Sequence, residues 1–414
     1  MCAFFWCGRR ELNPYGKTTR PSNVRVCQFR HSRNGSTSIH EKNRKVNSCF
    51  KNNTKIFLFL LLANIKRLFI AEFSLPLLIL KHYYAKIILY KLIGGSNMST
   101  ESKFPRKPLI RKLGTIGCNN IVETTPIVFK GELYRFEVVR RRSFTSETVC
   151  ESWRDLDDLP CLRFIHVKSN SSTPLFAEGH TFGFPLALGD VMYVVTGGSK
   201  DWGSDRLLFY KSEDLVNWEQ YSELYLPGWK IFNMNIAKMG EVYTLLVEIN
   251  APAEECGRPF TFRFLTSEDM INWSLTPSDH VFQKDRYAGS PSLYAFEGDP
   301  YYYVGYLEAY PDRKYANCIA RSKDLISWEY SPVNPVLMYD DLEDKKIANP
   351  HLTPLDRNRI KEALNINNSD MELCEYLGRT IIYYSLGDQR GHEFLAEACY
   401  EGGMHEFLKA FFEA

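Results

Sequence analysis

Two carboxylate residues occupy matching positions in the first and last of a series of similar chain segments. Glu123 lies eight residues before the turn glycine Gly131, and Asp370 lies eight residues before Gly378. If the segments are equivalent, both side chains enter one cavity, where paired carboxyl groups can act as general acid and base on a glycosidic bond. We therefore predict that Glu123 and Asp370 are catalytic. The alternative is that each one caps a turn or binds a backbone amide.

The same count identifies polar residues of the intervening segments that should line this cavity. It gives Thr181 beside His180, Phe232 beside Asn233, and Ser290. We expect Asn233 and Ser290 to bind substrate. His180 could donate a proton or bind a sugar hydroxyl, although a lone histidine often does neither.

Three further residues are catalytic candidates on weaker grounds. Glu248 and Glu308 follow long apolar runs at the far end of second strands. Each could be an acid catalyst or a sugar ligand, or could pair with an arginine in a structural role. His351 precedes a predicted helix and is a candidate proton donor, with the same alternative as His180.

Loop residues supply the remaining candidates for substrate binding. Asp388-Gln-Arg-Gly391 resembles a loop that faces a ligand, in which Asp388 and Arg390 would bind substrate and Arg390 could orient a central carboxylate. Trp202 and Trp229 could stack on a sugar ring, or could simply pack within their loops. We find no set of metal ligands and no cofactor motif, and predict neither.

A repeated turn motif organises the chain around these candidates. Ser212-Glu-Asp-Leu-Val-Asn-Trp218 returns as Ser267-Glu-Asp-Met-Ile-Asn-Trp273 and as Ser322-Lys-Asp-Leu-Ile-Ser-Trp328, with the tryptophans 55 residues apart each time. A fixed period of this size indicates a repeat architecture. Ser and Asp can accept hydrogen bonds from turn amides, and the Trp can pack between units, so we interpret the motif as scaffold.

Five similar units follow one another from about residue 120. Each has a strand, a tight turn with a glycine, and a more hydrophobic strand, which is a strong hairpin signal. Units of about 50 residues built in this way are typical of propeller blades. We predict an all-β fold, a five-bladed β-propeller. The turn glycines are Gly131, Gly189, Gly240, Gly298 and Gly378.

The ends of the propeller are predicted in less detail. Pro354–Leu364 has the spacing of a short helix inserted in blade five, and Thr353-Pro354 is typical of a helix start. Residues 106–118 should supply either a strand that closes the ring or the first entry strand. Residues 405–412 could form the last strand or a terminal helix.

Composition restricts the partners and the compartment. The net charge of +2 hides an uneven distribution. Residues 1–97 hold 17 basic and 3 acidic residues, whereas residues 98–414 hold 34 basic and 46 acidic residues. An acidic globular part argues against a nucleic-acid partner. The eleven cysteines have no paired metal spacing, and seven of them follow residue 97, so we expect buried reduced thiols.

Residues 1–97 differ from the rest of the chain. They are basic, then apolar from Ile56 to Ile93, but charged residues interrupt every run before it reaches the ~20 residues of a membrane span. Met98-Ser-Thr-Glu resembles a natural start. We expect 1–97 to be an extension that is disordered or not native, residues 98–414 to form the propeller, and the protein to be cytoplasmic. The rival hypothesis is a membrane-anchoring leader, so that any membrane association runs through 1–97.

The repeated Ser-x-Asp-Leu-x-x-Trp turns after strand pairs resemble those of the five-bladed propeller glycoside hydrolases. These include the arabinanase/xylosidase, invertase and neoagarobiose hydrolase types. The segment from Asn368 to Gly391 looks like an uncharacterised branch of that superfamily. The resemblance covers residues 120–400, implies a carbohydrate substrate, and is specific for architecture rather than for the reaction.

One departure from the better-known members concerns catalysis. The resemblance implies an Asp base in blade one, an Asp in blade two and a Glu acid in blade three. Here blade one offers Glu123, blade two offers no carboxylate at the matching position, and Glu248 of blade three lies at the other end of a strand. We therefore predict a glycosidase acting on a small oligosaccharide or glycoside. The alternatives are a glycoside phosphorylase, a non-catalytic carbohydrate-binding propeller and a protein-interaction propeller.

Overall fold

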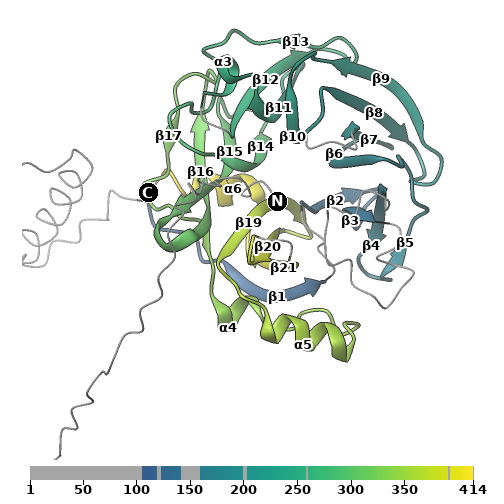
Figure 1. Ribbon diagram of the computed structural model, residues 1–414, viewed down its shortest axis with the longest axis vertical. Helices are drawn as coiled ribbons and strands as arrows, with labels where there is room; N and C mark the ends of the chain where they lie inside the picture. The colour runs from purple at the N-terminus through teal and green to yellow at the C-terminus, as the bar shows by residue number, and fades with distance from the viewer. Residues whose placement is uncertain are drawn as a thin grey trace, which may run out of the picture. The chain divides into compact units, whose positions relative to one another are not determined.

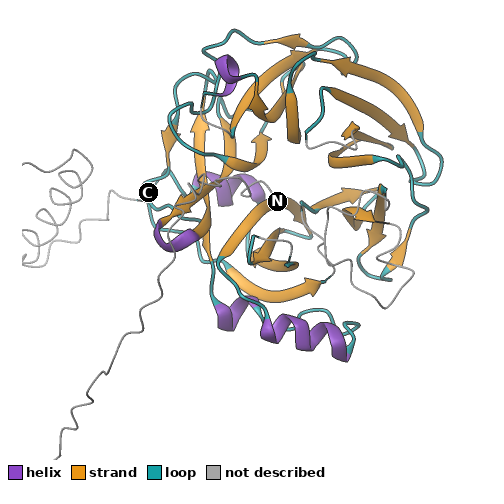
Figure 2. Cartoon of the chain, viewed as in Figure 1, coloured by secondary structure: helices purple, strands orange, loops and turns teal. Residues whose placement is uncertain are grey.

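The computed structural model of the protein describes residues 105–118, 123–140, 159–198, 203–257, 260–389 and 392–413. Strands dominate these residues and helices are few and short (Figure 2), so the predicted all-β class is confirmed. Our predictions on residues 1–97, on Trp202 and on Arg390 lie outside the described residues. Within the described part of the chain, no helix is both long and apolar enough to cross a membrane.

Every predicted glycine turn joins two antiparallel strands. Unit one contains β2 (Thr125–Phe129), β3 (Glu132–Arg140), β4 (Pro160–His166) and β5 (Ser171–Ser172), and unit two contains β6 (His180–Leu188), β7 (Val191–Gly198), β8 (Arg206–Ser212) and β9 (Glu219–Tyr225). Unit three contains β10 (Lys230–Met239), β11 (Val242–Ala251), β12 (Thr261–Ser267) and β13 (Ser274–Leu275), and unit four contains β14 (Gly289–Ala295), β15 (Tyr302–Tyr310), β16 (Lys314–Ser322) and β17 (Glu329–Tyr330). Unit five contains β19 (Asn367–Tyr376), β20 (Arg379–Gly387) and β21 (Glu393–Tyr400), together with β1 (Arg111–Gly117).

The first strands of the units surround a common centre. Units one, two and three are separate four-stranded sheets, whereas units four and five join in a nine-stranded sheet through one parallel pairing, Tyr315 with Asn367. The strands β2, β6, β10, β14 and β19 contact one another in this order, and β19 also contacts β2. Figure 1 shows them nearest the centre, with β5, β9 and β13 at the outside. Residues at one end of these strands can therefore converge.

The repeated turns have the scaffold role that their sequence predicts. In the first copy, Ser212 Oγ accepts the Leu215 amide at 2.9 Å, and Asp214 Oδ1 accepts two further amides of the turn. The other two copies make the same contacts. Each Trp then stacks on a Phe in the third strand of the preceding unit. The ring centroids are 5.8 Å apart for Trp218 and Phe164, 5.6 Å for Trp273 and Phe209, and 5.8 Å for Trp328 and Phe264.

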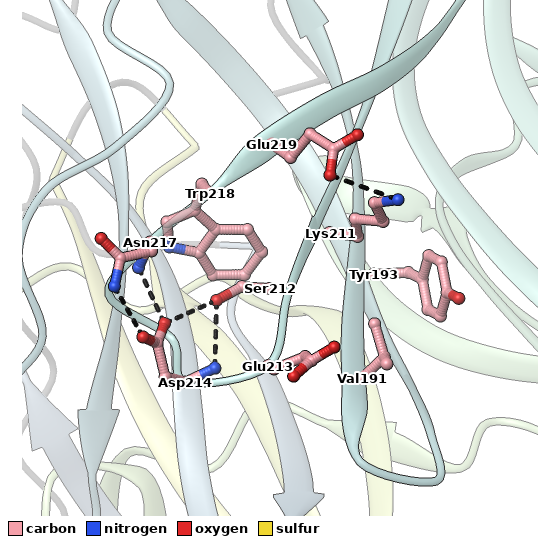
Figure 3. Close-up of a pocket in the computed structure, with 9 residues that line it drawn as sticks. All are labelled: Val191, Tyr193, Lys211, Ser212, Glu213, Asp214, Asn217, Trp218 and Glu219. Carbon is pink, nitrogen blue, oxygen red and sulfur yellow. Dashed lines mark hydrogen bonds and ion pairs between the residues drawn. The ribbon is translucent and has the colours of Figure 1, made fainter.

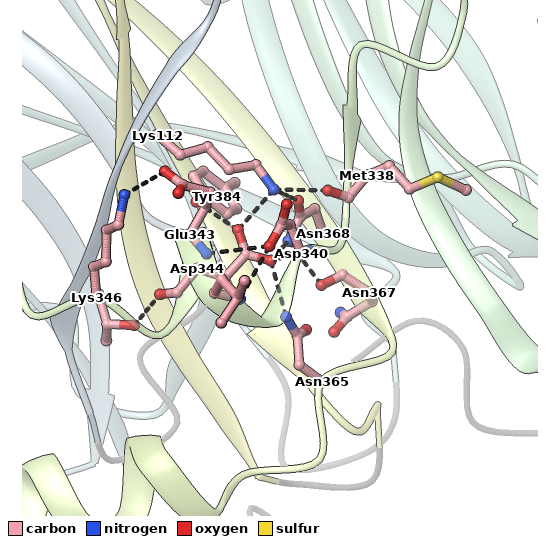
Figure 4. A network of polar contacts seen from close by, with 12 residues as sticks. Lys112, Met338, Asp340, Glu343, Asp344, Lys346, Asn365, Asn367, Asn368 and Tyr384 are labelled. Atoms are coloured by element: carbon pink, nitrogen blue, oxygen red, sulfur yellow. Dashed lines mark hydrogen bonds and ion pairs between the residues drawn. The ribbon is translucent and has the colours of Figure 1, made fainter. Parts of the chain in front are cut away.

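The N-terminal strand closes the ring, as predicted, because β1 pairs antiparallel with β21. A buried polar network reinforces this closure (Figure 4). At its centre the Asp344 carboxylate accepts hydrogen bonds from Lys112 of β1 at 2.7 Å and from Tyr384 of β20 at 2.9 Å. Asn365 and Asn368 donate to its other oxygen at 2.8 and 3.0 Å. The network therefore ties the first strand to the last unit.

Helices occupy the insertion and the C-terminal end. The predicted insertion forms α5 (Pro354–Glu362), and Thr353 with Asp356 makes a capping box at its start. The short helix α4 (Asp341–Asp344), which precedes the insertion, was not predicted. The C-terminal segment, which the sequence left open between strand and helix, forms α6 (Met404–Lys409). The other elements of the described residues are a short β18 (Leu337–Met338), α3 (Ala253–Cys256) and the 3-10 helix η2 (Pro311–Arg313). The six described cysteines are all buried.

Candidate active site

The first strands carry a repeated kink at the end where the predicted site lies. The pairing register shifts in β6, β10, β14 and β19, and Phe182, Ser290 and Asp370 have left-handed φ angles of 54°, 50° and 52° at the shifts in β6, β14 and β19. Glu123, just before β2, has a φ of 53°. Such bulges redirect side chains, and left-handed non-glycine residues cost energy that proteins tolerate mainly at functional sites.

The kinks bring the predicted residues of four units together. Glu123, Asn233, Ser290 and Asp370 all line one cavity at the centre of the first strands. In β6 the left-handed residue is Phe182 rather than Thr181, the residue given by counting from the glycine, and its ring lies in the core. The other residues that line the cavity are Thr125, Gly183, Met234, Pro291 and Glu372.

One carboxylate oxygen of Asp370 accepts a hydrogen bond, and the other has no partner among the described residues. Its side chain is buried, and Ser369 Oγ donates to Oδ2 at 2.8 Å. Asn367 and Gln389 donate to the same Ser369 hydroxyl at 3.0 and 3.2 Å, which fixes its direction. Oδ1 accepts no hydrogen bond from the described residues. Because a buried acceptor normally has a partner, this oxygen is suited to bind a water molecule or a substrate hydroxyl.

The Glu123 carboxyl group favours its protonated form. Burial raises the pKa of its carboxyl to about 8, and the negative charges of Asp370 and Glu248 act in the same direction. Asn233 Nδ2 donates to Glu123 Oε1 at 3.3 Å, which opposes the rise only in part. At neutral pH Glu123 is therefore mainly protonated and can serve as a proton donor.

Glu248 lies behind this pair rather than in the cavity wall. It is fully buried on β11, and Asn233 Nδ2 donates to its Oε2 at 2.7 Å. The same amide group thus contacts both Glu123 and Glu248. This contact places Glu248 where it can orient Asn233 and influence Glu123 electrostatically.

Two acidic residues of the site were missed by the sequence reasoning. Glu372 lines the cavity and accepts hydrogen bonds from Asn235 at 3.1 Å and from the Tyr294 hydroxyl at 3.0 Å. Burial raises the pKa of Glu372 to about 8. Glu393, at the start of β21, also has a pKa raised to about 8, by burial first and then by the charges of Asp370 and Asp388.

The alternation of strand residues could have identified Glu372, which lies two positions after Asp370 on β19. The predicted order of units makes β14 and β19 neighbours, but it does not indicate that the Tyr294 side chain reaches across to Glu372. Glu393 accepts the Gln389 amide at 2.6 Å across a loop, and nothing in its local sequence marks it.

The remaining candidates lie outside the cavity wall. Glu308 pairs with Arg286 at 3.5 Å, burial raises its pKa, and the arginine opposes this. His180 approaches the backbone oxygen of Glu178 at 3.0 Å and lies edge-on to Tyr210. His351 is exposed before α5.

Two loop candidates complete the account of the predicted residues. Trp229 packs against the apolar cluster of units two and three, which corresponds to the packing alternative for this residue. Asp388 contacts His392 at 2.9 Å beside the loop that precedes β21.

Comparisons with known proteins give similarities at the level of the fold. No family model and no curated protein matches the sequence. Among solved structures, the chain resembles the catalytic domain of a GH62 α-L-arabinofuranosidase from Coprinopsis cinerea, with 10% identity, coverage of 72% of this chain and 98% of that chain, and a TM-score of 0.46. A second α-L-arabinofuranosidase, from Podospora anserina in complex with cellotriose, has 9% identity, coverage of 72% and 98%, and a TM-score of 0.46.

A xylan β-1,4-xylosidase from Bacillus halodurans is also similar, with 13% identity, coverage of 70% of this chain and 54% of that chain, and a TM-score of 0.43. At these identities the likeness concerns the arrangement of the strands and assigns no role to any residue.

Proposed function

We propose that the protein is a five-bladed β-propeller glycoside hydrolase that cleaves a small oligosaccharide or glycoside. The observation that supports this most directly is the pairing of Glu123 and Asp370 on one cavity. One carboxyl group has a pKa raised to about 8, and the other has an oxygen without a partner among the described residues. Different environments for two neighbouring carboxyl groups are typical of acid and base pairs.

In the proposed mechanism the two carboxyl groups act on opposite sides of the glycosidic bond. The protonated Glu123 transfers its proton to the glycosidic oxygen as the bond to the anomeric carbon breaks. Asp370 accepts a proton from the water that attacks this carbon, so one water molecule is consumed and two hydroxyl products form. Asn233 positions Glu123 through the hydrogen bond described above, and Ser290 is placed to contact the substrate.

A panel of nitrophenyl glycosides tests this assignment with the wild-type protein and the variants Asp370→Asn and Glu123→Gln. We expect Asp370→Asn to lose at least about a hundredfold in kcat/KM, which is typical for removal of a general base, and Glu123→Gln to lose less on this panel because a nitrophenolate needs little protonation to leave. Glu297→Gln is the matched control, because Glu297 is exposed beside the β14–β15 turn. Unchanged turnover in both site variants would exclude the proposed roles.

Leaving-group chemistry separates the two roles. A dinitrophenolate leaves without being protonated, so Glu123→Gln should retain most activity on dinitrophenyl glycosides and lose it on alkyl glycosides. Asp370→Asn should lose activity on both. Turnover that requires added phosphate would instead indicate a glycoside phosphorylase, and saturable sugar binding without turnover would indicate a binding protein.

A further inference from the structure

A second hollow lies in unit two, apart from the central cavity (Figure 3). It has a volume of about 540 Å³, within the range of ligand pockets, and shares no lining residue with the central cavity. We call it the unit-two hollow and define it by Val191, Tyr193, Lys211, Glu213 and Glu219. The repeat allows its residues to be compared with their equivalents in unit four.

Unit four carries a tyrosine, a cationic residue and a glutamate at the equivalent positions, 110 residues later. Tyr303, Arg321 and Glu329 correspond to Tyr193, Lys211 and Glu219. The strand pairing agrees, since Met192 pairs with Ser212 in unit two and Tyr302 pairs with Ser322 in unit four. The ion pair is also repeated, at 3.3 Å between Lys211 and Glu219 and at 2.7 Å between Arg321 and Glu329.

In unit four this surface is covered by the end of the chain itself. The Arg321 guanidinium lies 4.4 Å from the centre of the Phe412 ring and 3.3 Å from a Glu413 carboxylate oxygen. The Tyr303 and Phe412 ring centroids are 5.9 Å apart. As a result the Arg321 side chain is only 8% exposed, whereas that of Lys211 is 39% exposed. The unit-four surface therefore shows that this combination of a tyrosine and a cation accepts an aromatic ring.

Two substitutions distinguish the unit-two hollow from its covered equivalent. Val191 replaces Tyr301, whose ring fills space in unit four under Arg321 at 4.1 Å and Lys323 at 4.8 Å. Glu213 replaces Lys323 and so reverses the charge at the rim. The first change leaves more room beside Lys211, and the second favours a basic group in the occupant where unit four has its own lysine.

We propose that the unit-two hollow is a docking site for a peptide segment of a partner protein that carries an aromatic residue next to a basic one. The aromatic ring packs on Tyr193 and beside the Lys211 ammonium, as Phe412 packs on Tyr303 and Arg321. The basic side chain pairs with the carboxylate of Glu213, which is exposed, while the backbone oxygen of Glu213 accepts a hydrogen bond from Lys130 at 2.8 Å. This proposal does not depend on the proposed glycosidase activity.

Fluorescence anisotropy with a labelled peptide, Ala-Ala-Phe-Lys-Ala-Ala with blocked ends, tests the proposal on the full chain. We expect saturable binding that weakens about tenfold when the peptide Phe is replaced by Ala, a loss in the range of a partly desolvated cation–π contact. The protein variant Lys211→Ala should weaken binding to a similar extent. Absence of saturable binding overturns the proposal, and so does displacement of the peptide by a neutral oligosaccharide, which would identify the hollow as a sugar site.

Charge reversal at an exposed position gives a matched comparison, because such a substitution should leave the fold intact. Glu213→Lys gives this exposed position the positive charge that unit four has. The variant should bind the Phe-Lys peptide more weakly and a Phe-Glu peptide more tightly. Glu268→Lys changes the same turn position in unit three, which lacks the tyrosine and the cation, and should leave both affinities unchanged. Equal effects of the two variants would mean that only net charge is sensed, and would also overturn the proposal.

Discussion

At the scale of single residues, the site depends on how burial distributes protons among neighbouring carboxyl groups. The pKa of Glu123, Glu372 and Glu393 is raised to about 8 in each case, chiefly by burial. Asp370 instead accepts a hydrogen bond from Ser369 at 2.8 Å on one oxygen, and its other oxygen has no partner among the described residues. The neighbouring carboxyl groups of the site therefore have different environments.

Activity should fall as the pH rises through about 8, because Glu123 must be protonated to donate. The sign follows from the direction of the shift: a raised pKa extends the protonated form from acidic into neutral pH. Measurement of kcat/KM against pH on an alkyl glycoside substrate should show this limb. The limb should be absent for a dinitrophenyl glycoside, and a limb that persists there would assign the titration to another group.

The residues of the site could be predicted only as far as strand register allowed. Counting from the turn glycines reached Glu123 and Asp370 because a two-residue turn fixes the register of both of its strands. Glu248 was identified, but its contact with Asn233 depends on the kink in β10, which the sequence does not reveal. Tyr294 could not be predicted, because it reaches Glu372 from a different unit.

At the scale of elements, the repeated turn works through one charged side chain and one indole ring. The Asp214, Asp269 and Asp324 carboxylates each accept turn amides, and these hydrogen bonds hold their pKa well below the usual range. The sequence predicted this element well because all of its contacts are local, apart from the Trp–Phe stack. The three indoles nevertheless differ in their polar contacts.

Trp328→Phe should destabilise the protein more than Trp273→Phe. The Trp328 indole N–H donates to the Val281 backbone oxygen at 3.1 Å, whereas the Trp273 N–H is buried and has no partner among the described residues. Both variants lose similar apolar area, so the difference should be about 1 kcal/mol, the usual net value of a hydrogen bond. Urea unfolding of the two variants in parallel measures it, and equal losses would mean that the Val281 contact contributes nothing.

At the scale of the whole molecule, stability depends on joining the first strand to the last unit. The Lys112–Asp344 pair is buried, with side chains 11% and 0% exposed. Burial of charge is costly unless the pair stays intact and every lone pair is satisfied. The closure itself was predicted, because a ring must pair its two ends. The polar network was not predicted, because it joins residues more than 200 positions apart and no local sequence pattern indicates it.

Lys112→Met should therefore cost about 3 kcal/mol or more in the free energy of unfolding, since it leaves Asp344 charged and buried without its cation. Lys346→Met is the matched control, because Lys346 pairs with Glu343 near the same helix at 52% and 42% exposure and should cost less than about 1 kcal/mol. Denaturant unfolding compares them. Adding Asp344→Asn to Lys112→Met should recover part of the loss, and a failure to do so would argue against the buried charge as its cause.

Stability should also decline from about pH 5 to above pH 8. Glu123, Glu372 and Glu393 have folded pKa values near 8 against an ordinary value of 4.5, so the folded state binds more protons in this interval. Their contribution is complete below about pH 4.5 and is lost as the pH rises through about 8. Urea unfolding midpoints at pH 5.5 and 8.5 test this pH dependence of stability. Glu372→Gln should reduce the difference between the two midpoints. A midpoint that is higher at pH 8.5 would contradict this assignment.

The pairing of β1 with β21 also sets the order of events on the ribosome. The partner of β1 emerges about 280 residues after it, which at ~5–20 residues per second is a wait of roughly 15–55 seconds. During this time both the nascent strand and the growing sheet keep exposed edges that can pair with other chains. A chain truncated before β21 never acquires this partner, so premature termination should yield aggregates rather than a smaller folded protein.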